Sequence, residues 1–212
     1  DKVYVNKSIW YNTFYMSFII FCILILSIIA HEVAHGIAAL WQGDPTAKYA
    51  GRLTLNPISH IDMVGSIIVP LICVMSGAGI FFGWAKPVPV NPYNFRNQRW
   101  GEALVAAAGP FVNIAIALVF SVIIRIYDGG AQFTELAAGM IVINIVLAVF
   151  NLIPIPPLDG SKILFSILPQ KLYGFKTWVE QKGFIISIVI VLAAWQFMIP
   201  IVLWIVNLLI GR

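Results

Sequence analysis

Phe14–Ala30 reads FYMSFIIFCILILSIIA, a run without one charged side chain. Directly after it comes His31-Glu32-Val33-Ala34-His35, which places three ionisable groups within five residues. The run approaches the roughly 20 apolar residues that a membrane-spanning helix needs. Ionisable groups at membrane depth are rare and usually functional, because hydrocarbon makes them costly. This stretch therefore indicates both a membrane fold and the place to look for chemistry.

The composition extends the membrane interpretation to the whole chain. Of the 212 residues, 60% are hydrophobic and 10% are charged, whereas soluble domains carry about 25% charged residues. The uncharged runs near or above spanning length are Phe14–Ala30, Met63–Ala85, Ala103–Ile124, Leu136–Leu158 and Gly183–Gly211. We predict an all-α polytopic membrane protein, a bundle of four to five transmembrane helices with short extended stretches. No linker divides it, so residues 1–212 are expected to form a single domain.

Charge and cysteine usage exclude some other classes. The net charge of +4 comes from cations in short loops, which is typical of membrane orientation and not of nucleic-acid binding. Cys22 and Cys73 lie in apolar runs without CxxC spacing, so buried, reduced thiols are expected.

Turn-forming residues divide the chain between the runs. The first helix is expected from Trp10 or Tyr11 to Trp41-Gln42, with Gly43-Asp44-Pro45 as its stop. The segment Trp84–Trp100 is expected to be extended, because three prolines interrupt it. The other predicted helices are about Gly101–Tyr127, Thr134–Leu152 and Gly183–Leu209.

The spacing of HExxH has a direct chemical meaning on a helix. His31 and His35 are four residues apart and project from nearly one face. Glu32 follows within about 100° of both, given roughly 100° of rotation per residue. The motif offers two imidazoles to one zinc ion and places a carboxylate beside it as general base. HExxH also occurs by chance in soluble helices, but chance fits poorly with ionisable groups at membrane depth.

Catalytic zinc needs a third protein ligand and an open position. His60 is the one remaining histidine, and several carboxylates are available. Asp159 differs from the others because it follows a long apolar helix through the proline-broken turn Asn151-Leu-Ile-Pro-Ile-Pro-Pro-Leu-Asp159. Such a break is tolerated at membrane depth against protein or a water-filled cavity. An aspartate cap at an interfacial helix end is the alternative. His60 and Asp62 are left out of the predicted site.

HEVAHG together with NLIPIPPLDG resembles the site-2 protease family of intramembrane zinc metalloproteases, peptidase family M50. GRLTLNPISHIDMVG, GWAKPVPVNPYNFRN and AAAGPFVN look like its short bacterial branch, which lacks a PDZ domain. The resemblance covers roughly Ile28 to Ser161, with separate motifs in the family's order.

The resemblance implies a role for each matching residue. His31, His35 and Asp159 would hold one Zn²⁺ per chain, and Glu32 would activate water. Asn151 is similar to the family's asparagine that helps to hold the substrate strand. Asn113 resembles an asparagine that faces the site from the next core helix, although the small residues of Ala106–Gly109 also suit simple helix packing.

Ligands of one ion must lie at one depth, and this constrains the topology. If Ser66–Gly83 crosses the membrane, HExxH and Asp159 fall on opposite sides; if it re-enters, they meet. Prolines and glycines in that segment favour the re-entrant alternative. The positive-inside rule then places the active-site side towards the cytoplasm of a cell-membrane protein.

The expected function is hydrolysis of peptide bonds within or beside transmembrane segments of another membrane protein in the lipid bilayer. A substrate strand could pair with the extended, proline-rich segment Trp84–Pro92, although a plain connection is an equal alternative. A zinc transporter or sensor is the main rival from another class, but it would need further polar ligands across the bilayer. Retention of Glu32 speaks against a catalytically dead homologue.

Overall fold

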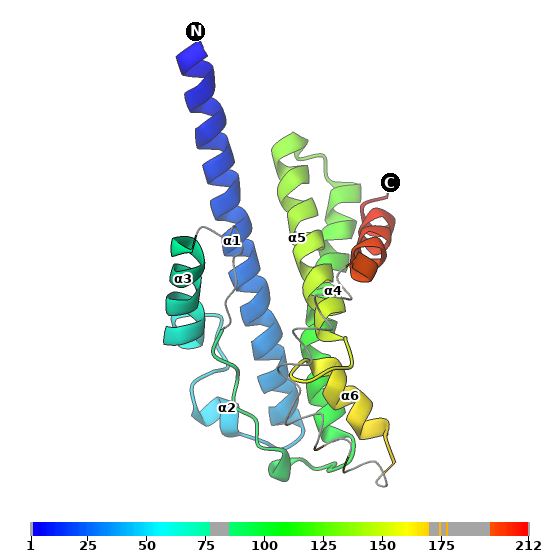
Figure 1. Ribbon diagram of the computed structural model, residues 1–212. Helices are drawn as coiled ribbons and strands as arrows, with labels where there is room; N and C mark the ends of the chain where they lie inside the picture. The colour runs from blue at the N-terminus through cyan, green and yellow to red at the C-terminus, as the bar shows by residue number, and fades with distance from the viewer. Residues whose placement is uncertain (1, 77–84, 170–173, 175–176, 178–195, 212) are drawn as a thin grey trace.

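The computed structural model describes residues 2–76, 85–169, 174, 177 and 196–211 (Figure 1). Within these residues all regular structure is helical and no strand is present. The long helices are α1 (Lys2–Trp41), α4 (Gly101–Ile126) and α5 (Gly130–Asn151). The short ones are α2 (Thr46–Tyr49), η1 (Pro57–His60), η2 (Met63–Ile68), α3 (Val69–Met75), η3 (Pro92–Asn94), α6 (Asp159–Ile167) and Gln196–Ile210.

Three of these helices are long and apolar enough to cross a membrane. They are Phe18–Trp41 within α1, then α4 and α5, with mean hydropathies of 2.1 to 2.3. The helical membrane class is therefore confirmed. The predicted total of four to five stays a prediction: Gln196–Ile210 is shorter than a span requires, and residues 183–195 of the predicted last helix lie outside the described part.

Helix boundaries follow the turn signals with small differences. The helix α1 ends at Trp41, within the predicted end Trp41-Gln42, and Gly43 just beyond it adopts φ +102° with its N–H bonded to Leu40 O. A left-handed residue just past the last turn is a common helix end, and glycine adopts it without strain. The start of α1 at Lys2 is earlier than predicted, and α5 begins at Gly130 rather than Thr134. Within the predicted extended segment Trp84–Trp100, residues 85–91 contain no helix, as their prolines predict, but the prediction is wrong for Pro92–Asn94, which form the short helix η3.

The long helices alternate in direction, with α4 packed against both α1 and α5. The contact between α4, α5 and Gln196–Ile210 is apolar and is formed by Ala117, Ile141, Ile145, Val202 and Val206. Burial of such side chains against one another holds the bundle where lipid itself gives no hydrophobic driving force. The second apolar cluster, Ala39, Phe95 and Val105, joins the end of α1 to the start of α4.

The end of α1 and the start of α4 lie at the same end of the bundle. Arg96 N, shortly before α4, donates to Gln42 O, just past α1, over 2.7 Å. Figure 1 shows α6 at this end as well. The chain between α1 and α4 therefore makes no net crossing, as the re-entrant alternative requires. The longest helical stretch described between them, Met63–Met75, is too short to span the bilayer, and residues 77–84 lie outside the described part.

Candidate active site

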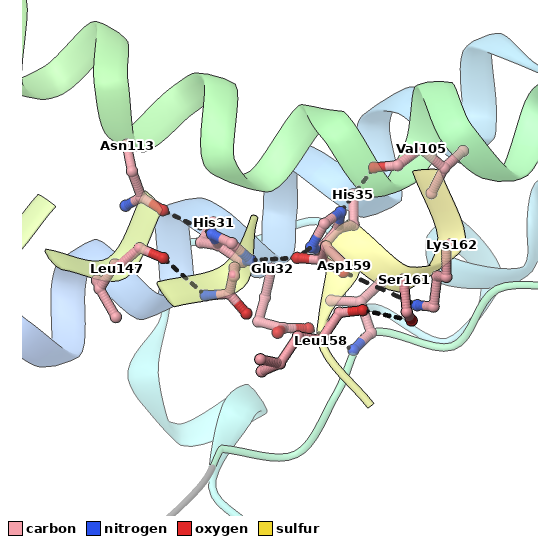
Figure 2. A network of polar contacts seen from close by, with 12 residues as sticks. His31, Glu32, His35, Val105, Asn113, Leu147, Leu158, Asp159, Ser161 and Lys162 are labelled. Atoms are coloured by element: carbon pink, nitrogen blue, oxygen red, sulfur yellow. Dashed lines mark hydrogen bonds and ion pairs between the residues drawn. The ribbon is translucent and has the colours of Figure 1, made fainter. Parts of the chain in front are cut away.

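His31 and His35 lie one turn apart near the end of α1, and their rings meet edge to face with centroids 4.6 Å apart. Figure 2 shows Asp159, the first residue of α6, between them. Its Oδ2 lies 3.0 Å from His31 Nε2 and 3.2 Å from His35 Nε2. All three side chains belong to buried residues. The structure thus brings together the three residues predicted as metal ligands, although 128 positions separate His31 from Asp159.

Asp159 reaches the histidines through a turn that the sequence makes unavoidable. The helix α5 ends at Asn151, and the prolines that follow cannot continue it. The chain then enters α6, where a Cβ on Gly160 would collide with Leu152 O. This contact is with backbone and cannot be relieved by rotating a side chain, so glycine is required beside Asp159.

Both histidine rings are oriented by hydrogen bonds at Nδ1, the nitrogen that faces away from Asp159. His35 Nδ1 lies 2.7 Å from Val105 O, and His31 Nδ1 lies 2.6 Å from Asn113 Oδ1. A carbonyl oxygen only accepts, so His35 Nδ1 must carry a proton, and its neutral ring presents a lone pair at Nε2. That lone pair faces Asp159 Oδ2, which is also an acceptor. Two acceptors at this distance need a cation between them, either a proton or a metal ion.

The donor set fits zinc. Ligand atoms about 2.0–2.1 Å from one tetrahedral ion lie roughly 3.3 Å from each other, close to the 3.0 and 3.2 Å found here. Two imidazoles and one carboxylate are a known catalytic zinc set, which leaves the fourth position open. The Nδ1 bonds to Asn113 and Val105 are the outer partners that such ligands usually have.

Glu32 stands beside this group. Its carboxylate and the two imidazoles place ligand atoms within 4.8 Å of one another. Glu32 Oε2 accepts a hydrogen bond of 2.9 Å from Val88 N, in the extended segment 85–91. One carboxylate oxygen of Glu32 is therefore held in place by the backbone of this segment.

These residues open into a pocket of about 480 Å³. Segment 85–91 forms one wall and the starts of α4 and α6 form others. The lining residues are His31, Glu32, His35, Pro87, Val88, Val90, Pro92, Phe95, Glu102, Val105, Asn151, Pro157, Asp159 and Lys162. Lys162 Nζ lies 3.9 Å from Asp159 Oδ1.

Charged side chains hold segment 85–91 against the site. Arg52 Nη2 donates to Lys86 O over 2.5 Å. At the other end, Asp44 Oδ2 accepts from Asn91 N over 2.7 Å. Burial by itself raises the pKa of Asp44, but hydrogen bonds from Thr46, Asn91 and Asn94 outweigh it and lower that pKa, so the carboxyl stays ionised.

The two predicted substrate-binding asparagines lie in different places. Asn151 lines the pocket and donates to Leu147 O over 2.9 Å. Asn113 is fully buried behind His31 and does not line the pocket. This placement suits orientation of His31 better than contact with a substrate, and the substrate role of both residues stays a prediction.

His60 and Asp62, left out of the predicted site, have local contacts of their own. His60 Nε2 lies 2.9 Å from Thr54 O, and its own carbonyl accepts from Lys86 N. Asp62 accepts from Gly65 N at the start of η2. Neither residue lines the pocket.

Sequence reasoning missed Asp44, Arg52 and Asn144 as parts of the site's support. Asp44 and Arg52 act on residues far along the chain, and no local pattern reveals that. Asn144 did have a signal, because it is a polar residue in an apolar helix, two turns before Asn151. For Gly109 the small-residue pattern was recognised as a close approach, but its partner was not: a Cβ there would lie 2.5 Å from His31 Nε2.

Comparison with known proteins indicates the family of the chain. The model of peptidase family M50 matches residues 129–195. The chain is 36% identical to "Putative zinc metalloprotease YwhC" of Bacillus subtilis over 87% of this chain and 84% of that protein. It is 27% identical to "Putative zinc metalloprotease Rip2" of Mycolicibacterium smegmatis, over 79% and 64%. With "Zinc metalloprotease MJ0392" of Methanocaldococcus jannaschii, the identity is 26% over 82% and 40%.

No solved structure matches the chain significantly. The extent of the likeness to the Bacillus subtilis protein, together with the family match over α5 and α6, decides the assignment. The chain belongs to peptidase family M50, the site-2 protease family of zinc metalloproteases.

Proposed function

We propose that this chain is an intramembrane zinc metalloprotease that cleaves peptide bonds in or near transmembrane segments of other membrane proteins. The observation that carries the proposal is the meeting of His31, His35 and Asp159, with Glu32 beside them, at a pocket among membrane-capable helices. Substrate and catalytic centre would then share one environment, and residues 1–212 would act as a single domain.

Each residue has a distinct task in this reaction. His31 Nε2, His35 Nε2 and Asp159 Oδ2 would hold the Zn²⁺. When bound, zinc supplies Lewis-acid chemistry, which acidifies water and polarises a carbonyl near neutral pH. Glu32 takes a proton from the attacking water on its carboxylate and delivers it to the leaving amine nitrogen. Burial of the site limits competing water, and Asn151 at the pocket wall is available to hold the substrate backbone.

A transporter or sensor would need further ligands along a path through the bilayer. Within the part of the chain that the structure describes, His31, Glu32 and His35 form the one metal-binding group of this kind. We therefore favour the hydrolase, and we place its active site on the cytoplasmic side of the cell membrane. Of the residues that the structure describes, the cations in the connections at that end are Lys48, Arg52, Lys86, Arg96, Arg99 and Lys162, an excess that the positive-inside rule associates with the cytoplasm.

Metal removal tests the proposal. The protein is incubated in liposomes with a set of transmembrane peptides, and mass spectrometry locates the products. Treatment with a chelator is expected to abolish cleavage, and added Zn²⁺ is expected to restore it at the same bonds. Cleavage that survives chelation, or products that fall only in soluble flanks far from the apolar stretch, would contradict the proposal.

Val88→Pro is expected to lower kcat about ten- to a hundredfold with little change in KM. Proline removes the N–H that holds Glu32 Oε2, and small misplacement of a reacting group costs up to about a hundredfold. The extended segment between Pro87 and Pro89 already accepts prolines. Kinetics on a cleaved peptide provide the measurement.

Val88→Ala is the matched control, because it trims the side chain and keeps the N–H. Equal losses in Val88→Ala and Val88→Pro would show that side-chain packing, not the hydrogen bond, matters. Pairing of a substrate strand along Ala85–Val90 predicts a different result, a raised KM in Val90→Pro. Proline supplies no N–H at positions 87 and 89, and the Val88 N–H is bonded to Glu32 Oε2, so Val90 is the position tested as a donor to a substrate strand.

A further inference from the structure

A chain of hydrogen-bonded polar side chains runs through the bundle behind His31. It joins Ser27 of α1, Asn113 of α4 and Asn144 of α5 to the histidine ring. The two asparagines have no exposed surface, and Ser27 is 2% exposed. Polar groups buried this deeply between membrane helices are costly unless every bond is made. The network therefore needs an explanation beyond helix association, because association of the helices does not require the hydrogen bonds to end at His31.

The donor and acceptor roles along this network are fixed at Asn144. Its Nδ2 donates to Met140 O over 2.9 Å and to Ser27 Oγ over 2.9 Å. A backbone carbonyl can only accept, so the amide atom facing Met140 must be the nitrogen. Asn144 therefore presents its oxygen, Oδ1, to Asn113.

The orientation of the Asn144 amide determines that of the Asn113 amide, which contacts His31. Its Nδ2 donates to Asn144 Oδ1 over 2.8 Å and lies 3.4 Å from a second acceptor, Ser27 O. Its Oδ1 consequently faces His31 Nδ1 at 2.6 Å. An amide oxygen accepts only, so His31 Nδ1 must be the protonated nitrogen. In the neutral ring, Nε2 is then the free lone pair that faces Asp159 (Figure 2).

His35 has the same tautomer, and here a backbone carbonyl alone determines it, because Val105 O contacts its Nδ1 directly. The bond from His31 Nδ1 goes instead to an amide that could bind in either of two orientations. If Asn113 were flipped, its NH₂ group would face His31 Nδ1. The ring would then carry its proton on Nε2, where a metal must bind. Only the bonds of Asn113 to Asn144 and Ser27 exclude this orientation.

We propose that Asn144 is a positioning residue for the metal centre: it fixes the amide of Asn113, which fixes the proton of His31 on Nδ1 and leaves Nε2 free for the metal. The inference rests on the proposed function in that it takes His31 as a zinc ligand. It concerns metal binding and the ring's proton, so both can be measured without a substrate.

Two substitutions at one position separate positioning from packing. Asn144→Leu keeps the approximate volume and removes all hydrogen bonding. Asn144→Asp keeps an acceptor for Asn113 and, protonated in this apolar surrounding, a donor for Met140 O. The dissociation constant for Zn²⁺ is measured by competition with a chelator. We expect Asn144→Leu to bind zinc about ten- to a hundredfold more weakly, and Asn144→Asp to remain within a few-fold of the unmodified protein.

Ser121→Ala is the matched control, because it also removes a buried hydrogen bond between helices. The Ser121 hydroxyl on α4 bonds to Leu209 O, away from the site. It is expected to leave zinc affinity unchanged. Equal weakening in Asn144→Leu and Asn144→Asp, or tight binding in Asn144→Leu, would overturn the proposal in favour of packing.

A second measurement needs no Asn144 variant and covers the case in which Asn144→Leu does not fold. The chain has three histidines, so ¹⁵N-histidine labelling gives a simple spectrum, from which His31 is assigned by difference. In the metal-free protein His31 Nδ1 is expected to carry a proton. A neutral His31 ring with its proton on Nε2 would overturn the proposal. Zinc binding with this tautomer but without peptide cleavage would leave the positioning role standing and remove the proposed protease function.

Discussion

Glu32→Gln is expected to lower kcat for peptide hydrolysis by about 10²–10⁴-fold while the protein still binds one zinc per chain. Removal of a general base costs this much in many enzymes. Glutamine keeps the shape of the side chain, and its amide oxygen can still accept from Val88 N. It cannot take a proton from water near neutral pH. The proposed zinc ligands His31, His35 and Asp159 are untouched, so metal content measured by atomic emission should stay at the unmodified level.

Glu102→Gln is the matched control, because Glu102 also lines the pocket, from the first turn of α4. It is expected to retain hydrolysis within a few-fold. Loss of zinc in Glu32→Gln would mean that Glu32 is a metal ligand. This outcome needs testing because the Glu32 carboxylate lies in the same ligand cluster as the two imidazoles. Full hydrolysis in the variant would exclude Glu32 as the base.

The local part of the site follows from sequence because helix geometry is regular. A spacing of four residues brings two side chains to one face of a helix, so HExxH determines the relative positions of His31, Glu32 and His35 before any tertiary contact is known. The position of Asp159 needed more: a proline-broken turn suggested it, and the resemblance to a known family added to this suggestion. The structure then adds the contact of 3.0 Å between Asp159 and His31.

Contacts between distant residues are what the sequence could not supply. Asn113 was recognised as a residue of interest, yet whether it meets a substrate or His31 depends on how α4 is rotated against α1. The same holds for Asp44, which anchors Asn91 across a long loop. Hydrophobicity identifies spans of sufficient length, but it does not specify rotation, because lipid and protein interior are similarly apolar.

Asp159→Asn is expected to weaken zinc binding by more than the roughly hundredfold loss that removal of an outer partner of a ligand causes. The variant replaces the one anionic ligand by a neutral amide of the same shape. Zinc content after purification and the dissociation constant by chelator competition are the measurements. Asp128→Asn is the matched control, because Asp128 lies in the exposed connection between α4 and α5, at the other end of these helices.

The metal-free Asp159→Asn protein should nevertheless fold, and this makes the experiment decisive. An asparagine NH₂ has two hydrogens, and the structure places two imidazole nitrogens within 3.2 Å of one carboxylate oxygen. The amide can donate to both lone pairs, where the carboxylate needs a cation in between. Zinc binding stabilises the native state by about 2.7 kcal/mol at a hundred times its dissociation constant. Zinc should therefore raise the Tm of the unmodified protein and of Asp128→Asn but not that of Asp159→Asn. A folded Asp159→Asn protein with unchanged zinc would remove Asp159 from the metal, and the argument from equal ligand depth would lose its basis.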